Sequence, residues 1–134
     1  MIVIDANVMV VALSSPSAQG DAARAAMLAD DGWIAPAHMP LEVLRTVRKA
    51  VLGDRLSTKD VDAAFGALTA MQIEYVGTDL ALLQAVWAMR HNVSVYDAAY
   101  LAVAAVHEAP LVTFDARLAK AAERATPNVR VVLL

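Results

Sequence analysis

Short apolar runs recur along the chain and are separated by longer segments of mixed polarity. The runs are rich in Val, Ile and Leu, and most do not alternate with polar residues. This pattern is typical of strands buried on both faces of a parallel sheet. It predicts strands at residues 2–4, 33–35, 74–76, 111–114 and 129–133.

The segments between these runs carry apolar residues every three or four positions, which predicts helices. Leu44, Val47 and Val51 form such a stripe before Gly53, and Ser57 is a suitable N-cap for the helix that follows. We expect helices at residues 19–30, 40–53, 57–71, 97–106 and 115–125, and one capped by Thr78 that runs to about residue 90. Directly after Asp5 we expect a short turn, and the pattern assigns no element to the residues between that turn and residue 19.

The alternating order of strands and helices predicts an α/β fold with a mostly parallel central sheet of about five strands and helices on both faces. The chain has 134 residues, which suits one domain, and it contains no repeat, low-complexity segment or linker. We therefore expect residues 1–134 to form a single domain.

Composition narrows the possible chemistry. The chain has no cysteine, which excludes disulfides, a thiolate nucleophile and a cysteine-based zinc site. The start of the sequence has no basic segment ahead of its apolar run, so it does not resemble a secretory signal. The longest apolar stretch, residues 98–106, is far shorter than the roughly 20 residues of a membrane-spanning helix. We expect a cytoplasmic protein without a membrane partner.

Four acidic residues are placed where a parallel sheet binds ligands. Asp5 and Asp115 directly follow predicted strands, Asp97 lies in the first turn of a helix, and Glu42 lies one turn into another. The carboxyl ends of parallel strands form one crevice, so these side chains are expected to converge there. Converging carboxylates raise their pKa values or bind a cation, and an all-oxygen site suits Mg²⁺, with Mn²⁺ as a substitute.

Each acid also has a purely structural explanation. Asp97 and Asp115 are favourable charges at helix N-termini, Asp5 is a possible cap for the turn after it, and Glu42 is spaced to pair with Arg45. The net charge of −3 does not decide between these explanations. Setting the four acids aside leaves 11 basic against 10 acidic residues, a balance that permits RNA bound at one cleft.

Four ordered segments of the chain resemble the PIN-domain family of nucleases. The similar segments are Val-Ile-Asp-Ala-Asn at residues 3–7, Leu-Glu-Val-Leu at 41–44, Tyr-Asp-Ala-Ala-Tyr-Leu-Ala at 96–102 and Leu-Val-Thr-Phe-Asp-Ala-Arg-Leu at 111–118. Among its small members, the chain resembles VapC-type toxins of toxin–antitoxin pairs. The resemblance implies an Mg²⁺- or Mn²⁺-dependent endoribonuclease, a cognate antitoxin partner and a homodimer.

The resemblance also assigns residues. It implies that Asp5, Glu42, Asp97 and Asp115 are the metal-site acids and that Asn7 and Thr113 orient carboxylates or water. Some members carry a further acid two residues after the last aspartate. That position is Arg117 here, so we expect four acids rather than five, with a role for Arg117 in contacting RNA or an acid.

Other functions fit the sequence less well or are left open by it. A response-regulator receiver needs paired acids after its first strand, and a haloacid-dehalogenase-like phosphatase needs a second Asp where Asn7 stands. A housekeeping RNA-processing nuclease with the same chemistry and a catalytically silent RNA- or protein-binding module both stay open. Basic residues near Glu42, among them Arg45 and Arg48, are equally well explained as phosphate guides and as a solvated helix face. His38, in the loop before Glu42, has no support for a role from the sequence.

Overall fold

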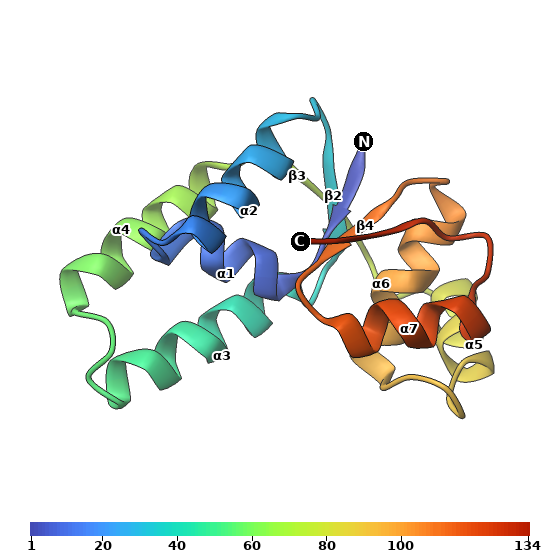
Figure 1. Ribbon diagram of the computed structural model, residues 1–134. Helices are drawn as coiled ribbons and strands as arrows, with labels where there is room; N and C mark the ends of the chain where they lie inside the picture. The colour runs from blue at the N-terminus through green and yellow to red at the C-terminus, as the bar shows by residue number, and fades with distance from the viewer.

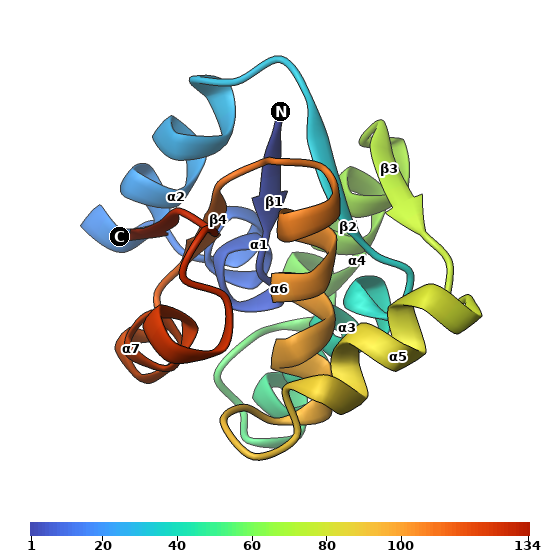
Figure 2. The same cartoon turned by 90° about the vertical axis from the view of Figure 1, so that its right-hand side faces the viewer.

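The computed structural model describes residues 1–134 and contains one sheet of five strands, all of them paired in parallel (Figures 1 and 2). The expected α/β fold with a parallel five-stranded sheet is therefore confirmed. The strands are β1 (Ile2–Ile4), β2 (Trp33–Pro36), β3 (Ile73–Val76), β4 (Leu111–Thr113) and β5 (Val131–Leu133).

The strand order is β3-β2-β1-β4-β5, so the chain adds strands first on one side of the central strand β1 and then on the other. The chain moves outward from β1 to β2 and β3, then returns to place β4 on the other side of β1. Val3 of β1 accordingly pairs with Ile34 on one side and with Leu111 on the other. All three residues of β1 are buried, as the run of apolar residues predicts.

Seven helices cover the two faces of the sheet. Figure 1 shows α1 to α4 on one side and α5 to α7 on the other. None of the helices is long and apolar enough to span a membrane. The helices are α1 (Ala6–Ser14), α2 (Ala18–Leu28), α3 (Met39–Leu52), α4 (Thr58–Ala70), α5 (Leu80–Ala88), α6 (Val95–Val106) and α7 (Ala116–Ala125).

Helix α6 is the most deeply buried helix because its sequence offers small residues on every side. Every residue from Ala98 to Ala104 is buried, and four of these seven are alanine. Small side chains allow a helix to lie close to the strands beneath it, and α6 contacts β1, β2 and β4. This packing fixes the position of Asp97 and Tyr100, which α6 also carries.

Several element boundaries differ from those expected, and one helix was missed. The chain enters α1 directly after Asp5, where only a turn was expected. Helix α5 is capped by Asp79 rather than Thr78, since the Asp79 side chain accepts a hydrogen bond from the backbone N–H of Leu82. Helix α6 begins at Val95, two residues before Asp97, with Ser94 as its N-cap. The N-cap expected at Ser57 is confirmed by a capping box with Asp60.

Candidate active site

The strand order reverses between β1 and β4, and in open parallel sheets this is the place where ligands bind, at the carboxyl ends of the strands. Asp5 directly follows β1, and Thr113 is the last residue of β4, with Asp115 two residues further on. The fold therefore brings residues that are 108 positions apart in sequence into direct contact at this edge.

Asp5 is held at this edge by two hydrogen bonds to the same carboxylate oxygen. The Thr113 hydroxyl donates to Asp5 Oδ2 at 2.6 Å, and the Asn7 side-chain amide donates to it at 2.9 Å. Asp5 is only 8% exposed and Thr113 is fully buried. The carboxylate consequently has one fixed orientation, with its second oxygen left without a hydrogen-bonding side chain.

The residues that hold Asp5 are themselves tied to the segment after β4. Asn7 accepts a hydrogen bond from the backbone N–H of Phe114 at 3.2 Å. The Thr113 hydroxyl oxygen accepts one from the backbone N–H of Asp115 at 2.9 Å. Thr113 and Asn7 thus link the end of β1 to the loop that carries Asp115, so one small network positions two of the candidate acids.

The charge on Asp5 is unfavourable in this environment. Burial raises the pKa of Asp5 from 3.8 to about 6, although the hydrogen bond from Thr113 and the backbone near Asn7 oppose the shift. The nearby negative charges of Asp97 and Glu42 raise this pKa further. No Lys, Arg or His forms an ion pair with Asp5. A bound cation is the kind of partner that would stabilise its ionised form.

Glu42 faces the same site from α3 and is clamped by two aromatic side chains. The Tyr100 hydroxyl, on α6, donates a hydrogen bond to Glu42 Oε2 at 2.6 Å. His38 Nε2 lies 3.4 Å from the same oxygen, too poorly aligned to count as a hydrogen bond. Burial favours a higher pKa for Glu42, but these contacts outweigh it and the pKa lies below its usual value. Arg45 is not within ion-pair distance of Glu42, although its positive charge also lowers the pKa of Glu42.

Asp115 caps α7, as its structural explanation proposed. One of its carboxylate oxygens accepts hydrogen bonds from the backbone N–H groups of Arg117 and Leu118. Burial opposes ionisation, but these bonds and the Arg117 side chain outweigh it, so the pKa of Asp115 lies below its ordinary value. The second oxygen is 3.6 Å from Arg117 Nη2. A capping role leaves this oxygen free for other contacts.

Asp97 lies in the first turn of α6 and its carboxylate accepts no hydrogen bond from another side chain. The cap of this helix is Ser94, whose hydroxyl accepts a hydrogen bond from the Asp97 backbone N–H. Asp97 is half-buried, and its charge acts on Asp5. Its place in the first turn is favourable for a negative charge, as its structural explanation proposed, but its side chain accepts no hydrogen bond from the backbone of the helix.

The donor set fits a hard divalent cation, although the side chains are not gathered around a common point. Glu42 and Asp97 are close enough for their charges to act on Asp5, and Thr113 links Asp5 to the backbone of Asp115. No three acidic or histidine side chains are near enough to one another to share a metal ion as they lie. The buried Asp5 charge and the all-oxygen donors match Mg²⁺ or Mn²⁺, and coordination by three of these acids requires side-chain movement.

Two residues at this site were not predicted to act in it. Tyr100 is buried as a core residue would be, but its hydroxyl reaches Glu42 across 58 positions of sequence. His38 was given no role, yet its ring packs against Tyr96 and Tyr100 with centroids 4.8 and 5.4 Å away. A buried tyrosine needs a hydrogen-bond partner for its hydroxyl, and Tyr100 lies within an apolar run. That need was the one feature of the sequence that suggested a contact for Tyr100 beyond packing.

Comparisons with known proteins agree with this arrangement. The family model of the PIN domain matches residues 2–124. Ribonuclease VapC1 of Mycobacterium tuberculosis is 36% identical over 119 residues, which cover 89% of this chain and 89% of that protein. Ribonuclease VapC3 of the same organism is 34% identical over 120 residues, covering 90% and 86% of the two chains.

Solved structures share the fold at lower sequence identity. A chain of a toxin–antitoxin complex from Klebsiella pneumoniae superposes with a TM-score of 0.70 at 18% identity, covering 98% of this chain and 96% of that one. VapC20 of M. tuberculosis, described as a sarcin-ricin loop cleaving toxin, superposes with a TM-score of 0.68 at 17% identity, covering 90% and 95%. Because the family model and relatives above 30% identity both span most of the sequence, the chain belongs to the PIN-domain family, among the VapC-type ribonucleases.

Proposed function

We propose that residues 1–134 form one PIN-type nuclease domain that cleaves RNA internally as the toxin of a toxin–antitoxin pair. Family membership supports ribonuclease chemistry, since the curated relatives VapC1 and VapC3 are named ribonucleases. The observation that carries the proposal is Asp5, a buried carboxylate fixed by Thr113 and Asn7 at the reversal point of the sheet, with no cationic partner in the protein. Such an arrangement has a stability cost that a structural role does not explain.

The proposed cofactor is Mg²⁺, with Mn²⁺ as a substitute, and VapC-type ribonucleases are generally dependent on a divalent metal. The residues that would hold it are Asp5, Glu42, Asp97 and Asp115. When bound, a divalent cation offsets the charge of the phosphodiester under attack and makes water a better nucleophile. The chain's own residues then have the task of holding the carboxylates in place.

The hydrogen bonds at the site describe how that task is performed. Thr113 and Asn7 occupy one oxygen of Asp5 and leave the other without a hydrogen-bonding side chain. Tyr100, on α6, likewise donates a hydrogen bond to one oxygen of Glu42 on α3 and leaves the other oxygen without one. Asp5 and Glu42 therefore each retain an oxygen without a hydrogen-bonding side chain, and that oxygen is available to a cation once the acids converge on it.

A protein partner is the second part of the proposal. Several structural neighbours are toxin–antitoxin complexes, among them one from Klebsiella pneumoniae and VapBC2 from Rickettsia felis. In this chain Leu80, Leu83 and Trp87 lie along one side of α5 and are 53–71% exposed, an apolar stripe of the kind that protein partners cover. We propose a cognate antitoxin and a second copy of the chain as partners. Light scattering of the purified chain, alone and co-expressed with the product of an adjacent reading frame, tests both.

A cleavage assay tests the enzymatic part. Purified protein is incubated with structured RNAs in Mg²⁺, in Mn²⁺ and in EDTA, beside Asp97→Asn and the matched surface variant Asp62→Asn. We expect cleavage by the wild type and Asp62→Asn that needs the cation, and none by Asp97→Asn with an unchanged circular dichroism spectrum. Full cleavage in EDTA, or by Asp97→Asn, would contradict the metal-carboxylate mechanism.

A further inference from the structure

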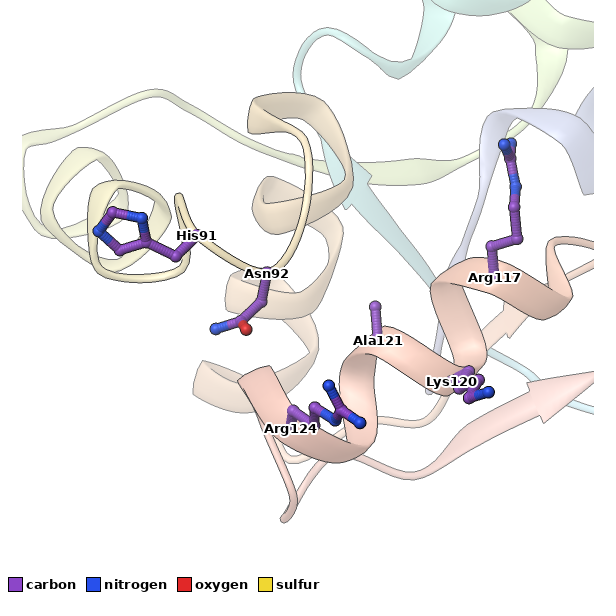
Figure 3. Close-up of a pocket in the computed structure, with 6 residues that line it drawn as sticks. All are labelled: His91, Asn92, Arg117, Lys120, Ala121 and Arg124. Atoms are coloured by element: carbon purple, nitrogen blue, oxygen red, sulfur yellow. The ribbon is translucent and has the colours of Figure 1, made fainter.

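A groove lined by cations lies beside the candidate active site. It has a volume of about 410 Å³ and is formed by the connection between α5 and α6 on one side and by α7 on the other. Figure 3 shows His91 and Asn92 on that connection and the other lining residues on α7. The α7 residues are Arg117, Lys120, Ala121 and Arg124.

The cations of this groove form one face of α7. Arg117, Lys120 and Arg124 are spaced by three and four residues, which places them on the same side of a helix. The groove contains no acidic residue, and neither Lys120 nor Arg124 forms an ion pair or a hydrogen bond through its side chain. In a chain of net charge −3, Lys120 and Arg124 place two unpaired positive charges close together on one helix face.

The groove is continuous with the acids through Arg117. The Nη2 atom of Arg117 is 3.6 Å from Asp115, whereas Arg124 lies two helical turns further along α7, roughly 10 Å away along the axis. A polyanion that entered the acidic crevice would be repelled by Asp5, Glu42 and Asp97 unless positive charge nearby held it. The cations of α7 supply that charge immediately beside the crevice.

We propose that this groove binds the phosphate backbone of the RNA strand as it leaves the cleavage site, with Lys120 and Arg124 as the contacting residues. The inference rests on the proposed ribonuclease function and adds the path of the substrate. The lining contains cations, an amide and an imidazole but no aromatic ring of Trp, Tyr or Phe on which a base could stack. The groove therefore holds phosphates without reading sequence, and target choice arises elsewhere.

The test measures RNA binding separately from cleavage. Lys120→Ala/Arg124→Ala is compared with Arg55→Ala/Lys59→Ala. This control removes the same charge from the connection between α3 and α4 and from the first turn of α4, on the opposite side of the molecule from α7 (Figure 1). All proteins carry Asp97→Asn so that a labelled single-stranded RNA stays intact, and its fluorescence anisotropy is followed against salt. Equal thermal unfolding midpoints establish that both variants fold.

We expect the α7 variant to bind RNA roughly tenfold more weakly at 0.15 M salt, with a log–log salt slope smaller by about 1.4 for two lost phosphate contacts. The control variant should match the parent. Without Asp97→Asn, the α7 variant should show a raised KM and an unchanged kcat. Unchanged affinity and slope would overturn the inference, as would tighter binding of a poly-glutamate peptide than of RNA in this groove.

The two proposals fail in different ways. If the wild type cleaves no RNA but the α7 variant still loses RNA affinity, the groove stands and the nuclease assignment falls. If the wild type cleaves and the α7 variant binds and cleaves like the control, only the groove assignment is wrong.

Discussion

Replacing Asp5 by Asn should stabilise the metal-free protein while it removes a proposed metal ligand. Asp5 is buried, and its pKa is raised from 3.8 to about 6 because ionisation is unfavourable in that environment. An amide has no charge to bury. Its oxygen can also accept the hydrogen bonds that Thr113 and Asn7 now donate to Oδ2, so the network survives the substitution.

The magnitude follows from the pKa. A shift of about two pKa units corresponds to about 3 kcal/mol between the protonated and ionised forms of Asp5. For a chain of this length, about 3 kcal/mol raises the unfolding midpoint by roughly 10 °C. The new amide N–H group points where the free carboxylate oxygen was, near the negative charges of Glu42 and Asp97, which are suitable acceptors. We therefore expect most of the gain to be realised.

The effect has a defined dependence on pH. The folded pKa is higher than the unfolded pKa, so the folded protein binds more protons between pH 3.8 and about 6, and its stability falls as pH rises through that window. Carboxyl groups far from the site are unaffected by the substitution, so the difference between the two proteins isolates Asp5 together with its coupling to Glu42 and Asp97. That difference should be near zero at pH 4 and reach its full size above pH 6.

Urea unfolding in EDTA from pH 4 to pH 8 measures this difference, with Asp62→Asn, an exposed acid on α4, as the control. Adding Mg²⁺ at pH 7 should stabilise the wild type and leave Asp5→Asn unchanged, because a ligand stabilises only the protein that binds it. A variant less stable than the wild type in EDTA at pH 7, or a difference that does not vary with pH, would refute the argument that Asp5 carries an uncompensated buried charge.

Three further substitutions test the supports of the site. Tyr100→Phe removes the hydrogen bond that holds Glu42 in place, which should raise the activation free energy by about 1 kcal/mol. We expect a roughly fivefold loss of kcat and weaker Mg²⁺ binding by calorimetry. Tyr75→Phe, at an exposed position, should change neither. Thr113→Val keeps the shape but leaves the Asp115 backbone N–H without its acceptor, so urea unfolding should show a loss of about 1–3 kcal/mol; an unchanged midpoint would contradict the network. Ser94→Ala removes the N-cap of α6 and should cost about 1 kcal/mol in the same assay, with Ser94→Asn restoring it.

The sheet could be predicted from the sequence because its strands are short, apolar and followed by helix signals, but α1 could not. Helix α1 reads Ala-Asn-Val-Met-Val-Val-Ala-Leu-Ser, and it packs against α2, α3 and α4 while also touching β4. A helix surrounded on most sides has apolar residues around its whole circumference, so its sequence lacks the period of 3.6 that identifies an amphipathic helix. Three β-branched valines further weaken the local helix preference.

Two of the candidate acids could be located from the sequence because they follow predicted strands. Asp5 and Asp115 were recognisable because each ends a predicted strand, and a parallel sheet places such ends together. The contact of Tyr100 with Glu42 could not be located, since it depends on how α6 is rotated and shifted against α3. A shift of one residue would turn the Tyr100 hydroxyl away from Glu42, and no local pattern specifies that register.

The buried polar residues of the chain make the strongest case that this edge of the sheet was selected for function. Only Asp5 and Thr113 are polar among the 35 buried residues, and they hydrogen-bond to each other at 2.6 Å. Elsewhere the core is entirely apolar, as stability alone would favour. A well-packed apolar pair in place of Asp5 and Thr113 would avoid the cost of a buried charge, so stability does not account for keeping them. The rest of the core obeys the rules of apolar packing, so the departure at this edge of the sheet supports the active site proposed there.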